Sequence, residues 1–83
     1  MIKILYFAGL RESIGSSGEE IALPPGVSDI ARLRAHLAAR GEPWGSLATA
    51  RNLRTAVNQR MVDEGAAVQD GDEIAFFPPV TGG

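Results

Sequence analysis

The sequence predicts an α+β fold in which a mixed sheet of about five strands carries one main helix on one face. Three observations lead to this prediction. Several short runs are rich in Ile, Val, Leu and Phe, as strands are, and one segment repeats its apolar residues with a helical period. Their order along the chain is strand, strand, helix, strand, short strand, strand. One helix covers only one face of such a sheet, so the other face is expected to stay open.

The first quarter of the chain is predicted to form a hairpin. Residues 1–8 are rich in Ile, Leu and aromatic residues, which is typical of a buried strand, and residues 19–23 have the composition of a second strand. Residues 9–18 between them contain three glycines and several serines, so they are expected to form a loop. Pro24-Pro25-Gly26 then ends the second strand.

The main helix is predicted to begin at Ser28, a residue type that favours the N-cap position. Ile30, Leu33 and Leu37 follow at helical spacing and form one apolar stripe. Gly41 is expected to act as the C-cap, because glycine tolerates the left-handed backbone that often ends a helix.

The second half of the chain is predicted to supply the remaining strands. Residues 46–52 are expected to hold a short helical turn, and no function is assigned to the polar, Ala-rich loop at residues 42–52. Residues 53–59 have strand composition, and Met61-Val62 is a short continuation or a separate edge strand. Asp70-Gly71 is a strong hairpin signal, and the last strand, residues 73–77, follows it directly.

Composition and charge exclude several classes of function. The 83 residues suit one small domain, here expected to span residues 1–77, with a projecting tail at residues 78–83. A net charge of −2 without a basic run does not favour nucleic-acid binding. The absence of cysteine excludes disulfides, thiolate nucleophiles and cysteine-based zinc sites. No signal peptide or membrane-spanning run is recognisable, so a cytoplasmic location is expected.

Strand alternation predicts an exposed apolar patch on the open face of the sheet. The faces that carry Lys3 and Glu73 are expected to be the uncovered ones, since an unpaired buried charge is costly. The opposite face of the first strand is expected to carry Ile2, Ile4, Tyr6 and Ala8. An exposed apolar patch usually marks a partner-binding surface. The predicted partner-binding residues are Leu5, Phe7, Met61 and Phe77.

No group of side chains indicates a catalytic, cofactor or metal site. His36 is the only histidine, and no nucleophile or metal-ligand spacing accompanies it. Asp70, Asp72 and Glu73 lack the spacing of a calcium loop, and a turn explains Asp70. The glycines of residues 9–18 match neither the GxGxxG dinucleotide-binding motif nor the Walker motif of phosphate-binding loops. Three other side chains are assigned structural roles: Trp44 as a packing anchor, and Asn58 and Gln59 as backbone caps.

The tail is therefore the remaining candidate for chemistry. Pro78-Pro79 fixes φ, ends strand pairing and favours an extended chain, so the residues that follow are expected to project from the domain. A Gly-Gly end can enter a channel too narrow for other residues. The terminal carboxylate of Gly83 is predicted to be the reacting group. The segment expected to insert into a partner comprises Pro78, Pro79, Val80, Thr81 and Gly82.

These features together resemble a known family. The order of elements with a C-terminal Gly-Gly is similar to the ubiquitin-like β-grasp fold. More narrowly, residues 56–59 and 70–83, together with residues 4–8 and Arg11-Glu12, resemble the small subunit of molybdopterin synthase. The resemblance covers the whole chain in order and length, and the terminal stretch is its most specific part.

The resemblance implies a sulfur carrier in molybdenum cofactor biosynthesis. It implies that an E1-like adenylating enzyme uses ATP to activate Gly83, which then becomes a thiocarboxylate. The tail is implied to insert into the large subunit, which supplies the acid–base groups and binds the cyclic pyranopterin precursor that receives the sulfur for the molybdopterin dithiolene. The implied assembly is a heterotetramer of two small and two large subunits. No cofactor is implied to be bound by the chain itself.

Other functions remain open at this point. The chain is alternatively a sulfur carrier for thiamin synthesis or tRNA thiolation, although Phe76-Phe77-Pro78-Pro79 and the length argue against the thiamin type. A ubiquitin-like protein modifier would join Gly83 to lysines of other proteins. A plain interaction module with an inert tail is the simplest alternative.

Overall fold

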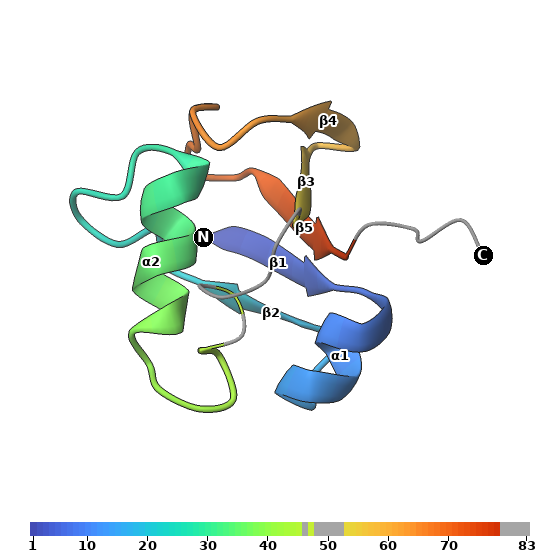
Figure 1. The fold of residues 1–83 in the computed structure, drawn as a ribbon. Helices are drawn as coiled ribbons and strands as arrows, with labels where there is room; N and C mark the ends of the chain where they lie inside the picture. Colours follow the sequence, from blue (N-terminus) through green and yellow to red (C-terminus); the bar gives the residue numbers. More distant parts are fainter. Residues whose placement is uncertain (46, 48–52, 79–83) are drawn as a thin grey trace.

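The computed structural model describes residues 1–45, 47 and 53–78, in which two helices pack with one five-stranded sheet. The elements are β1 (Ile2–Tyr6), α1 (Ala8–Ile14), β2 (Gly18–Ile21), α2 (Ile30–Ala38), β3 (Arg54–Val57), β4 (Arg60–Val62) and β5 (Glu73–Phe77). The strand order is β2-β1-β5-β3-β4; β1 and β5 are parallel, and the other neighbours are antiparallel (Figure 1). The predicted α+β class and its ubiquitin-like β-grasp arrangement are confirmed.

Helix α2 buries the predicted apolar stripe. Ile30, Leu33 and Leu37 are each 0% exposed and pack on the inner face of the sheet. The predicted cap at Ser28 is wrong by one residue, because the Asp29 carboxylate accepts a hydrogen bond from the Arg32 backbone N–H at 2.8 Å. An aspartate at this position also interacts favourably with the helix dipole.

The end of α2 also differs from the prediction. Ala39 is the C-cap and keeps a right-handed helical backbone. Gly41 has the left-handed φ of 86°, but it lies two residues further on, where its N–H bonds to the Ala38 carbonyl at 3.2 Å. The chain therefore adds a further tight turn before it leaves the helix.

The adjacent strands β1 and β5 contribute buried side chains from one face of the sheet to the core. The predicted inner residues Ile2, Ile4 and Tyr6 of β1 and Ile74 and Phe76 of β5 are all buried. Ala8, which was expected on the same face, is instead exposed, because its φ of 53° breaks the strand and starts α1.

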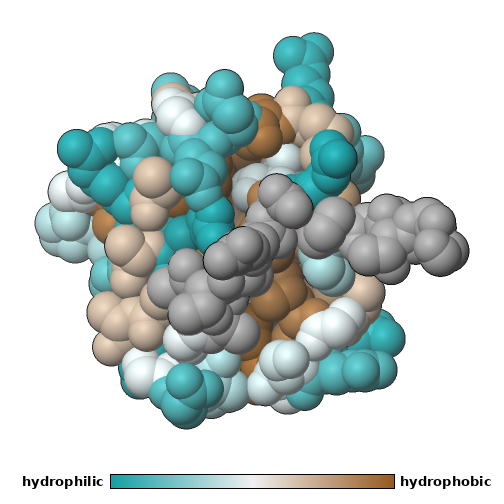
Figure 2. Space-filling model, viewed as in Figure 1, coloured by the Kyte–Doolittle hydropathy of each residue, from teal (hydrophilic) through white to brown (hydrophobic). Residues whose placement is uncertain are grey.

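In the view of Figure 1, hydrophilic and neutral residues cover most of the described surface, and hydrophobic surface is confined to smaller areas (Figure 2).

Helix α1 corrects the prediction of a loop at residues 9–18. Leu10 and Ile14, one helical turn apart, are buried in the core. Gly15 ends the helix in the left-handed conformation, and its N–H bonds to the Arg11 carbonyl at 2.9 Å. Two buried residues in a segment of seven are too few to stand out as a helical period in the sequence.

Strand ends differ from the prediction by up to a few residues. The second strand ends at Ile21 rather than at residue 23, and β3 ends at Val57 because Asn58 and Gln59 have positive φ and turn the chain into β4. The turn at Asp70-Gly71 is present, with Gly71 at φ 91°, but it does not close a hairpin. The segment before it forms only a single bridge, from Ala67 to Asp29.

The connection from α2 to β3 is described only in part. The short helical turn predicted at residues 46–52 lies outside the described residues, except for Leu47. Leu47 is 0% exposed and belongs to the core, and Trp44 packs against the same core as predicted. A region without a predicted function therefore supplies core side chains.

Candidate functional site

The open face of the sheet carries the predicted partner-binding residues. The register aligns Leu5 with Ala75, Ala75 with Ala56, and Ala56 with Met61. Directly paired residues point to the same side of a sheet, so this row crosses four strands on one face. Phe7 and Phe77 lie two residues beyond Leu5 and Ala75 on the same face. We call Leu5, Phe7, Met61 and Phe77 the open-face patch.

The patch is apolar and accessible. Phe7 is 45% exposed and Met61 is 55% exposed, which are large values for such side chains, and Leu5 and Phe77 are half-buried. The rings of Phe7 and Phe77 meet edge to face, with centroids 6.4 Å apart. This geometry is favourable for an aromatic pair, so the two rings stabilise each other at one end of the patch.

Local backbone structure explains why Phe7 is presented there. Its N–H bonds to the Phe76 carbonyl at 3.1 Å, so Phe7 still follows the ladder between β1 and β5. Ala8 then takes a positive φ and turns the chain into α1. Phe7 is thereby held at the point where the sheet ends, beside the residue from which the tail departs.

The tail itself is described only at its first residue. Pro78 is half-buried and follows β5 directly. The other predicted insertion residues and the predicted reacting group, Gly83, lie outside the described residues. β5 ends at Phe77, and the projecting tail at residues 78–83 stays a prediction.

The acidic residues before β5 are engaged in turn structure. The Asp70 carboxylate pairs with the N-terminal ammonium of Met1, and this hydrogen bond, together with the positive charge, holds the pKa of Asp70 below its usual value. Asp72 accepts a hydrogen bond from the Asn58 side-chain amide at 3.1 Å. The Asn58 side-chain oxygen accepts from the Glu73 N–H at 3.0 Å, which confirms its predicted capping role. The Gln59 side chain makes no hydrogen bond with another described residue, so its own capping role stays a prediction.

A polar network of Tyr6, Glu19 and Arg40 joins β1, β2 and the segment after α2. The Tyr6 hydroxyl donates to Glu19 Oε2 at 3.0 Å, and Arg40 Nη1 donates to both oxygens of Glu19 at 2.9 and 3.0 Å. Arg40 also lies over the Trp44 ring, 5.0 Å from its centroid. Burial raises the pKa of Tyr6, and the negative charge of Glu19 raises it further. This network is a structural one, since its groups are paired with one another.

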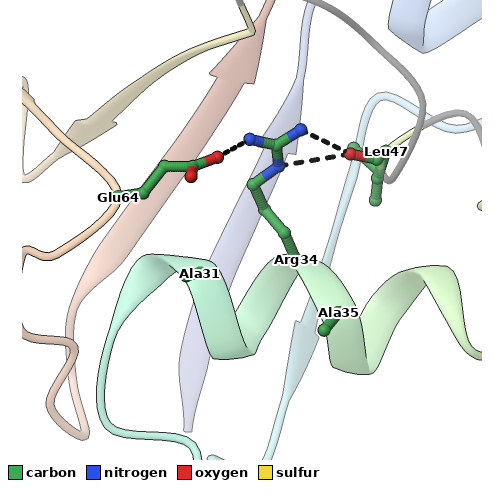
Figure 3. Close-up of a pocket in the computed structure, with 5 residues that line it drawn as sticks. All are labelled: Ala31, Arg34, Ala35, Leu47 and Glu64. Carbon is green, nitrogen blue, oxygen red and sulfur yellow. Dashed lines mark hydrogen bonds and ion pairs between the residues drawn. The ribbon is translucent and has the colours of Figure 1, made fainter.

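A shallow pocket beside α2 is a second candidate for a binding site (Figure 3). Its volume is about 250 Å³, and it is lined by Ala31, Arg34, Ala35, Leu47 and Glu64. Arg34 donates from Nε and Nη2 to the Leu47 carbonyl at 3.2 and 2.7 Å, and Nη1 pairs with Glu64. Partial burial lowers the pKa of Arg34. These bonds join α2 to two connections, so Arg34 serves to hold Leu47 in the core.

The described residues offer no arrangement for side-chain catalysis. His36 lies exposed on α2 and makes no hydrogen bond to another described residue. Across residues 1–45, 47 and 53–78, no group of three or more His, Cys, Asp or Glu is placed to hold a metal ion. No helix in the same ranges is long and apolar enough to cross a membrane. The open-face patch includes Phe77, the residue directly before the tail, and it is the best candidate for a functional surface.

Comparison with known proteins relates the whole chain to one family. Residues 4–83 match the ThiS family. The chain is 43% identical over 83 residues to the molybdopterin synthase sulfur carrier subunit of Escherichia coli (strain K12), with 100% of each chain covered.

Two solved structures resemble the fold closely. One is SAMP1 from Haloferax volcanii, with a TM-score of 0.76, 25% identity, and coverage of 99% of this chain and 98% of that chain. The other is the complex of subunits 1 and 2 of molybdopterin-converting factor from Helicobacter pylori 26695, with a TM-score of 0.67, 25% identity, and coverage of 99% and 97%.

Proposed function

Because this chain belongs to the ThiS family and matches sulfur carrier subunits over its full length, we propose that it carries sulfur for molybdopterin synthase on Gly83. The observation that carries the proposal is that the family match extends through residue 83 and so includes the Gly-Gly end. The open-face patch at the end of β5 supports it, since a carrier must dock where its tail departs.

The proposed chemistry begins with activation of a poor electrophile. A Gly83 carboxylate oxygen attacks the α-phosphorus of ATP in an activating enzyme, and pyrophosphate leaves. Sulfide from a donor then attacks the acyl carbon of the adenylate, the bond from that carbon to the phosphate oxygen breaks, AMP leaves, and a terminal thiocarboxylate remains. This sulfur is the nucleophile that attacks the cyclic pyranopterin precursor, and the carrier needs no cysteine to supply it.

We assign the acid–base groups to the large subunit. The open-face patch would bind that subunit, and residues 78–83 would reach into its active site, where water is excluded. The Helicobacter pylori complex of subunits 1 and 2 supports a partner of this kind. A heterotetramer of two carriers and two large subunits is the assembly that we expect.

The test is removal of Gly82 and Gly83. The shortened chain should fold as the full chain does, because the sheet ends at Phe77, but it should form no molybdopterin with the large subunit. Thr81→Ser serves as the matched control, since it changes the tail but keeps its length and its end. Molybdopterin formation by the shortened chain would refute the proposal.

Intact mass gives an independent measurement. Incubation with ATP, an E1-like activating enzyme and a sulfur donor should raise the mass of the full chain by the difference between sulfur and oxygen. An unchanged mass would contradict sulfur loading. A loaded chain that does not bind the large subunit would instead place it in another sulfur pathway, and isopeptide-linked Gly83 on many cellular proteins would identify a modifier.

A further inference from the structure

The chain contains a single side-chain amine. Lys3 is its only lysine, and the other basic side chains are arginines. An amine attacks an activated carboxyl group and forms an amide, whereas a guanidinium stays protonated and does not. Within a population of chains with activated C-termini, Lys3 and the N-terminal amine are therefore the two amines of the chain that can form a stable amide.

The structure distinguishes these two amines. The N-terminal ammonium of Met1 pairs with the Asp70 carboxylate and is hydrogen-bonded to it. Lys3 is exposed on the open face, and its ammonium makes no hydrogen bond or ion pair with the part of the chain that the structure describes. Lys3 is thus the amine that is not held in an ion pair by another described residue.

Two carboxylates flank Lys3 on the open face. The register pairs Lys3 with Glu20 of β2 on one side and with Glu73 of β5 on the other. Directly paired residues have Cβ atoms about 5 Å apart, within reach of long side chains. The neutral amine attacks, its nitrogen loses a proton as the amide forms, and the register places both carboxylates near enough to accept that proton.

We propose that Lys3 is the acceptor site for the activated Gly83 of a second copy of this chain. The inference rests on the proposed activation of Gly83. The Lys3 nitrogen attacks the Gly83 carbonyl carbon, the bond from that carbon to the phosphate oxygen breaks, AMP leaves, and an amide forms. The amine releases one proton for each acyl-adenylate consumed, so the step needs no oxidant and no further reactant.

A second copy fits this reaction better than the same chain does. β1 and β5 are parallel, so Lys3 lies at the opposite end of the open face from Phe77, where the tail begins. Four residues of strand separate these ends by about 13 Å. To reach its own Lys3, the tail would have to reverse over the sheet immediately after Pro78.

Such a conjugate would disable both copies as carriers. The donor copy has used its Gly83, and the acceptor copy has another chain attached two residues from Leu5 on the open face. Self-conjugation would therefore withdraw activated carrier when no sulfur acceptor is present.

The test uses the full chain with a thioester at Gly83, produced by thiol cleavage of an intein fusion. The thioester replaces the adenylate, and its thiol leaves as AMP would. The result is then independent of any activating enzyme, so it is separable from failure of the proposed function, which the mass shift with ATP and a sulfur donor measures. No Lys or Arg follows Arg60, so trypsin releases residues 61–83 as one peptide, joined to Lys3 in the conjugate.

The expected product is a two-chain species whose branched peptide joins Gly83 to Lys3. Lys3→Arg should abolish it, and Glu20→Gln with Glu73→Gln should slow it about tenfold, the effect of losing about 1.4 kcal/mol in the transition state. Arg32→Lys in the Lys3→Arg background is the matched control, since it places an exposed amine beside the Asp29 carboxylate on α2. Equal conjugation at position 32 of that control, linkage to the Met1 amine, or a cyclised single chain would each overturn the proposal.

Discussion

Replacement of Phe7 by aspartate tests the open-face patch most directly. Phe7 is 45% exposed, and a Phe side chain offers about 200 Å² in total, so about 90 Å² is available to a partner. At about 25 cal/mol per Å², covering this area contributes about 2 kcal/mol. That energy corresponds to about a 30-fold change in Kd. The aspartate would also have to lose its hydration in an apolar contact, so the loss should exceed this value.

The assay is titration calorimetry of each variant against the large subunit of molybdopterin synthase. His36→Asp is the matched control, because it adds the same carboxylate on the exposed side of α2 and should bind as the unmodified chain does. Phe7→Leu keeps the position apolar and should lose less affinity than Phe7→Asp. Circular dichroism must show that each variant is folded, since Phe7 also packs against Phe77. Unchanged affinity in a folded Phe7→Asp variant would show that the partner binds a different face.

Three further predictions concern the fold that supports this face. Leu47→Ala should lower the free energy of unfolding by about 2–5 kcal/mol, because Leu47 is 0% exposed. The same change at half-buried Leu23 should have a smaller effect. Similar losses for the two variants in urea unfolding would contradict the packing of Leu47. Gln59→Gly should raise stability by about 0.5–1 kcal/mol, since Gln59 has a φ of 69° that favours glycine. Gln69→Gly, where φ is not positive, should lower stability, and a loss at both positions would argue against strain in the turn. The raised pKa of Tyr6 means that the folded state favours the neutral phenol. The stability that this provides is present below the unfolded pKa of 10.0 and is lost as pH rises above it, so Tyr6→Phe should flatten thermal stability over that alkaline range; an equal decline in both proteins would rule Tyr6 out as the cause.

Local patterns predicted those parts of the fold whose signals are local. β5 was predicted at its observed bounds, because its alternating run lies between a turn and two prolines. The α2 stripe was found for a similar reason, since helical spacing alone places Ile30, Leu33 and Leu37 on one side. The N-cap position was missed because Ser28 and Asp29 are both good N-caps, and only the hydrogen bond from the Arg32 N–H distinguishes them.

The main error was α1. Its Leu10 and Ile14 are buried because β1 ends at Tyr6 and the chain turns at Ala8, which places the helix against β5, a strand distant in the sequence. Nothing within residues 9–18 indicates that contact. Leu47 was missed for the same reason, since its burial depends on α2 and on the hydrogen bonds of Arg34 to its carbonyl.

By itself, the sequence determined which strand residues share a face, and it predicts the Gly83 carboxylate as the reacting group. Alternation and the chemistry of Gly-Gly are properties of a few neighbouring residues, so they can be read locally. Only the tertiary structure decided that Leu5, Phe7, Phe77 and Met61 lie on one face, in a row that crosses β3 through Ala56. It also decided that Lys3 lies between Glu20 and Glu73 on that face. Those relations follow from strand order and register, which depend on how distant segments pack together.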